Sequence, residues 1–146
     1  MNRRHFLKTA GSAALFSSMG IVVSSCNVSD APLDLPEGIE KVGNNFEIDT
    51  TVAPFSNLRN DGSWLNIEEI EIIIVNIDGI TTRAFSNKCP HQGCQDAWLY
   101  RNGVWQCNCH NSRFTDAGVY IEGPANGDLT ELNVSVSGNI ITVQAP

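Results

Sequence analysis

The chain has 146 residues, with 16 acidic and 9 basic side chains, a formal net charge of −7 and a hydrophobic fraction of 42%. This length supports one small domain, and the hydrophobic fraction is too high for a disordered chain. The negative charge argues against nucleic-acid binding, and no apolar stretch reaches the roughly 18 residues of a membrane-spanning helix.

The first 25 residues have the features of an export signal. Three of the nine basic side chains lie within residues 1–8, and a short apolar stretch interrupted by Ser and Gly follows over 9–23. This pattern predicts a signal peptide over 1–25, and a permanent transmembrane anchor is the weaker alternative because the stretch is too short. Residues 3–8, Arg-Arg-His-Phe-Leu-Lys, resemble the twin-arginine export motif, and the alternative is an ordinary basic head.

Cys26 ends the segment Val-Ser-Ser-Cys, which resembles a bacterial lipoprotein box. We expect cleavage before Cys26, lipid attachment to its thiol, and an extended tether over 26–38 in which prolines and acids leave little to pack. The alternative is cleavage elsewhere, which leaves an unpaired thiol in an oxidising compartment. The predicted location is therefore the periplasmic side of a bacterial membrane or the cell surface, with the chain lipid-anchored.

From residue 39 onward the pattern is one of short strands and tight turns. The β-branched run over 72–77 predicts a strand, and the Asp-Gly dipeptide at 78–79 turns it into a second strand over 80–85. The Asn-Gly dipeptide at 102–103 is the strongest hairpin signal in the chain and joins the strands on either side of it. These elements predict an all-β domain over 39–146, a small antiparallel sandwich or barrel.

Further elements are predicted less directly. Residues 129–136 alternate and predict one strand with Leu132, Val134 and Val136 on one face, which a Ser-Gly-Asn turn at 137–139 returns into a last strand. Residues 64–71 are compatible with a helical segment.

Aromatic and acidic side chains are assigned to the interior and the surface respectively. We expect Phe85, Trp98 and Trp105 to lie in the core. Scattered acids such as Asp61, Glu68, Glu69 and Glu71 are expected to be solvated surface.

Cysteines and histidines gather in two segments. Residues 89–94 read Cys-Pro-His-Gln-Gly-Cys and residues 107–114 read Cys-Asn-Cys-His-Asn-Ser-Arg-Phe; apart from His5 and Cys26 they hold every His and Cys of the chain. Each segment follows a predicted strand and a hairpin separates them, so the two loops can converge at one end of a sheet. Such groups suit a tetrahedral zinc ion, two disulfides or an iron–sulfur cluster.

The two segments resemble the signature of the Rieske [2Fe-2S] proteins, Cys-x-His-x-Gly-Cys followed by Cys-x-Cys-His-x-Ser. The resemblance extends over roughly residues 72–143 and implies a Rieske-like fold whose cluster-binding subdomain is formed by two hairpin loops. It implies a [2Fe-2S] cluster with Cys89 and Cys107 as thiolate ligands of one iron and His91 and His110 as imidazole ligands of the other.

The same resemblance implies roles for neighbouring residues. Cys94 and Cys109 would form a disulfide that joins the two loops, and the Ser112 hydroxyl would donate to a bridging sulfide. The Gly-Pro-Ala segment at 123–125 resembles the proline loop that covers a third side of the cluster, with an ordinary turn as the alternative.

The mixed ligand set has an electrostatic consequence. Two thiolates and two neutral imidazoles bring an oxidised cluster to zero net charge, whereas four thiolates would bring it to about −2, so the mixed site accepts an electron more readily. Potentials of such centres span about −150 to +300 mV. Phe114 stands where many high-potential members have a Tyr whose hydroxyl donates to a ligand sulfur, so we expect a potential below the top of this range.

Two further departures from the family pattern bear on partners and loop shape. Gln92 stands where quinol-oxidising members usually have Leu, which argues against docking into a quinol pocket. Asn111 replaces a usual Gly, and Asn tolerates a left-handed backbone better than most residues.

Three functions compete on these grounds. The leading expectation is an exported one-electron carrier that exchanges electrons with a redox protein partner such as a cytochrome. The second is the iron–sulfur subunit of a quinol–cytochrome reductase or of a periplasmic molybdenum oxidoreductase. The third is a zinc-bound or disulfide-stapled surface lipoprotein without redox activity.

Overall fold

The computed structural model describes residues 34–146, and the expected signal peptide and Cys26 lie outside this part of the chain. The described residues form twelve β-strands and two short 3₁₀ helices, η1 (Phe55–Arg59) and η2 (Glu68–Ile70). No helix within residues 34–146 is long and apolar enough to cross a membrane.

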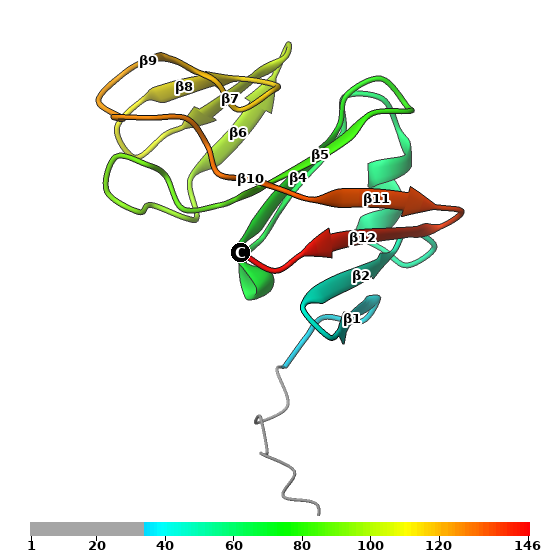
Figure 1. Ribbon diagram of the computed structural model, residues 1–146. Helices are drawn as coiled ribbons and strands as arrows, with labels where there is room; N and C mark the ends of the chain where they lie inside the picture. The colour runs from blue at the N-terminus through cyan, green and yellow to red at the C-terminus, as the bar shows by residue number, and fades with distance from the viewer. Residues whose placement is uncertain (1–33) are drawn as a thin grey trace, which may run out of the picture. The chain divides into compact units, whose positions relative to one another are not determined.

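The strands form three four-stranded antiparallel sheets (Figure 1), which confirms the all-β expectation. The first sheet, in spatial order, contains β1 (Ile39–Val42), β2 (Asn45–Asp49), β12 (Ile140–Gln144) and β11 (Val134–Ser137). The second contains β10 (Glu131–Leu132), β5 (Thr82–Ser86), β4 (Ile72–Asn76) and β3 (Trp64–Ile67). The third contains β6 (Trp98–Arg101), β7 (Val104–Cys107), β8 (Ser112–Thr115) and β9 (Tyr120–Glu122).

Strand β4 explains the β-branched run noted in the sequence. Successive side chains of a strand point to opposite faces, so a strand covered on both faces is apolar throughout. Ile72 and Ile74 enter the core that contains residues of the first sheet, here called the base core. Ile73 and Val75 enter a second core shared with the third sheet, here called the hairpin core. Strand β4 therefore contributes to both cores.

Trp105 lies at the centre of the hairpin core with no exposed surface. Its ring centroid lies 4.7 Å from that of Tyr100, 5.6 Å from Trp64 and 6.3 Å from Trp98. Aromatic contacts of this kind add about 0.5–1.5 kcal/mol each beyond the burial of area. The expectation that Phe85, Trp98 and Trp105 are core residues is confirmed, and their packing gives the third sheet a rigid support.

Two expectations about secondary structure are wrong. Residues 64–71 form no α-helix: Trp64–Ile67 is strand β3, in register with β4, and only η2 follows it. The long alternating segment 129–136 is not one strand, because β10 pairs with β5 and β11 pairs with β12. Val136 accordingly remains 52% exposed, whereas Leu132 is buried in the base core. In both segments pairing with distant strands decided the structure, which local pattern does not reveal.

All three expected hairpins are present: the turn after Ser137 joins β11 to β12 as expected, and the other two differ in their loops. Asn102 and Gly103 alone connect β6 to β7, and both have positive φ, as a two-residue turn of this type requires. The loop between β4 and β5 is longer than the predicted Asp-Gly turn and spans 77–81. In it the Asp78 carboxylate accepts hydrogen bonds from the backbone N–H groups of Ile80 and Thr81, which lower its pKa.

Candidate metal centre

Two loops lie next to each other at one end of the third sheet. The first, residues 89–94, leads from β5 toward β6, and within it Cys89 and Cys94 are joined by a backbone hydrogen bond of 2.9 Å. The second, residues 107–112, connects β7 to β8, where Cys107 and Ser112 are directly opposite each other in the register. Asn111 has a φ of 62°, the left-handed conformation expected where the family usually has Gly.

A disulfide between Cys94 and Cys109 joins the two loops, with the Cα atoms 6.6 Å apart. This is the pairing that the resemblance implied. The remaining two cysteines of the loops, Cys89 and Cys107, are free thiols, 3% and 1% exposed. The structure thus separates the four loop cysteines into one covalent pair near the surface and one buried pair of free thiols.

The two free thiols face each other beneath the loops. Burial and a hydrogen bond with Cys89 raise the pKa of the Cys107 thiol from its ordinary value of 9.0 to about 11. The backbone N–H groups of Cys109 and His110 act in the opposite direction and lower that pKa. A metal bound here would displace the thiol proton, because a coordinating cysteine is a thiolate.

The two histidines approach each other from the two loops. The ring centroids of His91 and His110 are 4.5 Å apart, with the ring planes nearly perpendicular at 84°. The Nδ1 atom of His91 is buried and has no hydrogen-bond partner among residues 34–146. A buried imidazole nitrogen without a protein partner is costly, and a metal bond would satisfy it. His110 itself is exposed, so this edge of the site faces solvent.

A third segment closes the site on the side of Ser112. The buried Ser112 Oγ accepts a hydrogen bond of 3.1 Å from the backbone N–H of Ala125, which leaves its own hydroxyl proton free to donate. Gly123 packs so closely that a Cβ added there would lie 2.6 Å from the Ser112 Cα. The expected Gly-Pro-Ala loop at 123–125 therefore lies against the second loop.

These residues fit a small metal cluster. Two buried thiols supply soft sulfur donors, and two adjacent imidazoles supply nitrogen donors. The fold and the site thus define a metal-binding domain in which two disulfide-linked loops offer mixed sulfur and nitrogen ligands.

Comparison with known families agrees with this class. The family model described as the Rieske [2Fe-2S] domain matches residues 49–133. The chain belongs to this family, and its cofactor is a [2Fe-2S] cluster.

Relatives support the same assignment. The cytochrome b6-f complex iron-sulfur subunit 2 of Nostoc sp. (strain PCC 7120) is 25% identical over 151 aligned residues, covering 98% of this chain and 84% of that protein. The putative Rieske 2Fe-2S iron-sulfur protein YhfW of Bacillus subtilis is 39% identical over 46 residues, covering 32% of this chain and 9% of that protein. The chain therefore spans only a small part of some of its relatives.

A solved structure supports the fold alone. The quaternary ammonium Rieske monooxygenase CntA in complex with L-carnitine matches with a TM-score of 0.51 and 19% identity. The match covers 62% of this chain and 30% of that one.

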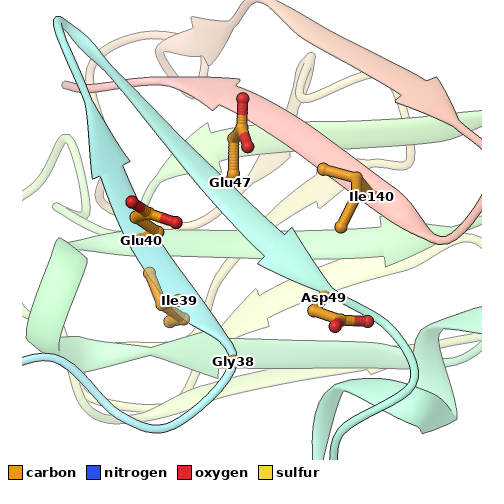
Figure 2. Close-up of a pocket in the computed structure, with 6 residues that line it drawn as sticks. All are labelled: Gly38, Ile39, Glu40, Glu47, Asp49 and Ile140. Carbon is orange, nitrogen blue, oxygen red and sulfur yellow. The ribbon is translucent and has the colours of Figure 1, made fainter.

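An acidic hollow lies elsewhere, on the first sheet (Figure 2). Its lining residues come from the β1–β2 end and from β12: Gly38, Ile39, Glu40, Glu47, Asp49 and Ile140. Glu40 lies directly opposite Glu47 in the register. The Asp49 carboxylate accepts hydrogen bonds from the hydroxyl and the backbone N–H of Thr51, which lower its pKa. None of the expected ligands lies there.

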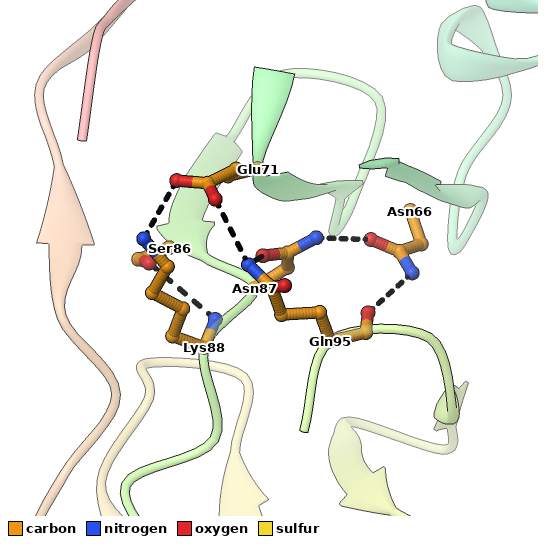
Figure 3. A network of polar contacts seen from close by, with 6 residues as sticks. All are labelled: Asn66, Glu71, Ser86, Asn87, Lys88 and Gln95. Atoms are coloured by element: carbon orange, nitrogen blue, oxygen red, sulfur yellow. Dashed lines mark hydrogen bonds and ion pairs between the residues drawn. The ribbon is translucent and has the colours of Figure 1, made fainter. Parts of the chain in front are cut away.

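Sequence reasoning missed one group of residues near the site. Asn66, Asn87 and Gln95 form a polar network beside the first loop (Figure 3). Glu71 lies at the surface as expected, with its side chain 44% exposed, and its carboxylate also accepts hydrogen bonds from Lys88 and Gln95, which lower its pKa. Nothing in a single sequence signals that an amide is buried, so this network became visible only in the structure.

Proposed function

We propose that the protein is a one-electron transfer protein whose Rieske cluster is bound by Cys89, His91, Cys107 and His110. The observation that carries the proposal is the contact between the His91 and His110 rings next to two buried free thiols. When bound, the cluster supplies a site that gains or loses one electron at a time.

The chain's own residues contribute insulation, orientation and access. Cys89 and Cys107 lie within the hairpin core, which keeps water from the sulfur side of the site. The disulfide and the Gly123 contact hold the loops together, so little rearrangement accompanies a change of charge. The exposed ring of His110 offers the edge at which a partner can approach. Ser112, whose oxygen already accepts from Ala125, is oriented as a hydroxyl donor.

Low-temperature electron paramagnetic resonance of the reduced protein tests this proposal. A mixed sulfur and nitrogen ligand set is expected to give a low average g value, which clusters with four thiolates do not give. Iron and acid-labile sulfide should be present at two atoms of each per chain. A colourless protein that binds zinc, with no iron and no labile sulfide, would support the surface lipoprotein without redox activity instead.

We also propose that the protein is exported and held at a membrane by lipid on Cys26, on the sequence features given above. Mass spectrometry of the protein purified from membranes tests this proposal. The mass of lipid on an N-terminal Cys26 is expected, and Cys26→Ser should release the domain into the soluble fraction. A mature chain that begins elsewhere and carries no lipid would contradict it.

A second candidate is the iron–sulfur subunit of a larger complex. It is favoured by the relative described as a cytochrome b6-f complex iron-sulfur subunit, because the alignment with this chain covers 84% of that protein. The exposed Gln92 argues against docking into a quinol pocket, and a periplasmic molybdenum oxidoreductase is the other such partner. Gentle solubilisation followed by size separation distinguishes the two: a carrier migrates alone, whereas a subunit migrates with haem or molybdenum.

A further inference from the structure

Asn87 is fully buried at the point where β5 leads into the first ligand loop. Its backbone N–H donates to the Glu71 carbonyl at 2.9 Å, and its carbonyl accepts from the Trp98 indole N–H at 2.7 Å. Its side-chain Nδ2 donates to Asn66 Oδ1 at 3.1 Å, and its Oδ1 accepts from Gln95 Nε2 at 3.3 Å. Every kind of polar group that this residue has is therefore used.

The same network holds the other end of the loop (Figure 3). Gln95 directly follows Cys94, and its backbone carbonyl accepts a hydrogen bond of 2.7 Å from Asn66 Nδ2. Its side chain reaches both Asn87 and Glu71. Asn66 belongs to β3, so the loop is attached at both ends to the second sheet, which lies outside the cluster-binding hairpins.

Glu71 belongs to the same network and has an unusual backbone conformation. Its φ is 58°, in the left-handed region that residues other than Gly rarely adopt. In this conformation its carbonyl meets Asn87, while its carboxylate meets Lys88 and Gln95. Such conformations persist where surrounding contacts require them.

We propose that Asn87 is a positioning residue for the metal centre. Backbone hydrogen bonds inside residues 89–94 define the shape of that loop, and β7 and β8 hold the second loop. The Asn87 network sets where the first loop stands relative to the second, and hence how Cys89 and His91 meet Cys107 and His110. This inference rests on the ligand set of the proposed function.

The chain offers a matched control for this role. Asn76 is also a buried asparagine, 5% exposed, whose Nδ2 donates to the Leu58 carbonyl at 2.9 Å and whose Oδ1 accepts from the Gly79 N–H at 2.7 Å. It lies at the far end of β4 and contacts neither loop through these bonds. Asn76→Ala and Asn87→Ala each leave buried groups without partners, so each is expected to lower stability.

The test compares the full chain carrying Asn87→Ala, Gln95→Ala or Asn76→Ala with the unsubstituted protein, at a temperature where all are folded. Asn87→Ala is expected to broaden the lines of the reduced-state resonance spectrum and to speed iron loss to a chelator roughly tenfold, the equivalent of about 1.4 kcal/mol. Gln95→Ala, a change at a half-buried side chain, should act in the same direction. Asn76→Ala should change neither readout, although it lowers the unfolding temperature.

The outcomes separate this inference from the proposed function. If Asn87→Ala fails to fold, Gln95→Ala decides the question. The positioning role is overturned if line widths and iron loss depend only on unfolding temperature, equally in the loop variants and in Asn76→Ala. That outcome leaves the proposed function intact. An unsubstituted protein that contains no Rieske signal would overturn both.

Discussion

The His91 and His110 rings meet edge to face, with centroids 4.5 Å apart, although a whole β-hairpin separates the two residues in the chain. The contact depends on both loops, since each contributes one ring. Under the proposed ligand set, replacement of either histidine removes a nitrogen donor that the other loop cannot supply.

The first prediction concerns these two rings. His91→Ala and His110→Ala are each expected to lower the iron content of the purified protein by at least roughly tenfold, because removal of a ligand costs more than removal of an outer-shell partner. Iron analysis measures this. Gln92→Ala changes an exposed side chain of the same loop and should leave the iron content unchanged; a full iron content in both His variants would refute the ligand assignment.

The second prediction concerns the disulfide. Cys109→Ser opens the Cys94–Cys109 link, whose closure across 15 residues is worth about 3 kcal/mol in the unfolded-chain model. The four proposed ligands remain, so the cluster should form but be lost more readily on warming. Loss of visible absorbance with temperature reports this, and equal retention in the variant and the unsubstituted protein would contradict it.

The third prediction concerns the potential. Phe114 is fully buried in the hairpin core, with its ring centroid 6.0 Å from that of Trp98. By the family resemblance, Phe114→Tyr adds a hydroxyl that donates to a ligand sulfur and stabilises the reduced state. The potential should rise by on the order of 60 mV, the one-electron equivalent of about 1.4 kcal/mol. Voltammetry measures it, and Phe46→Tyr in the base core is the control that should cause no rise.

The fourth prediction concerns the close approach of Gly123 to Ser112. Gly123 has a φ of 106°, and a Cβ there would lie 2.6 Å from the Ser112 Cα and 2.8 Å from the Asn111 carbonyl oxygen, backbone atoms that cannot move aside. Gly123→Ala should therefore destabilise the protein by about 2 kcal/mol and weaken the Ala125–Ser112 hydrogen bond. Gly127→Ala is the matched control, because a Cβ there meets nothing within 4 Å. Chemical denaturation of the two variants should separate them clearly.

The fifth prediction concerns pH in the cluster-free protein. Burial raises the pKa of Cys107 to about 11, above its ordinary value of 9.0, so the folded chain retains a proton that the unfolded chain has released. Stability is then unaffected below about pH 9 and falls as pH rises from about 9 to about 11. Thermal unfolding across this range measures the fall, and Cys107→Ser should reduce it. A fall of equal size in that variant would assign the effect to other groups.

Several features were predictable because they depend on short stretches of chain. Residues 89–94 and 107–112 contain their donor types at fixed spacing, and the Asn102-Gly103 turn needs only two residues with positive φ. The all-β class follows from short alternating or β-branched runs between turns. Such features require no knowledge of distant neighbours.

Other features required the fold. Residues 64–67 became a strand because β4 pairs with them, and β10 and β11 separated because their partners β5 and β12 belong to different sheets. The buried state of Asn87 goes with its hydrogen bonds to Asn66 of β3, to Trp98 of β6 and to Gln95, which directly follows the first loop. No local pattern distinguishes such a buried amide from a surface one.

The sequence by itself determined the chemistry of this protein, because the kinds of donor atom and their order along two loops are local properties. The tertiary structure decided which thiols are paired and which are free, which imidazole nitrogen is buried, and how the first loop is fastened to the second sheet. These depend on distances between residues far apart in the chain, and only the packing of two cores against the shared strand β4 establishes those distances.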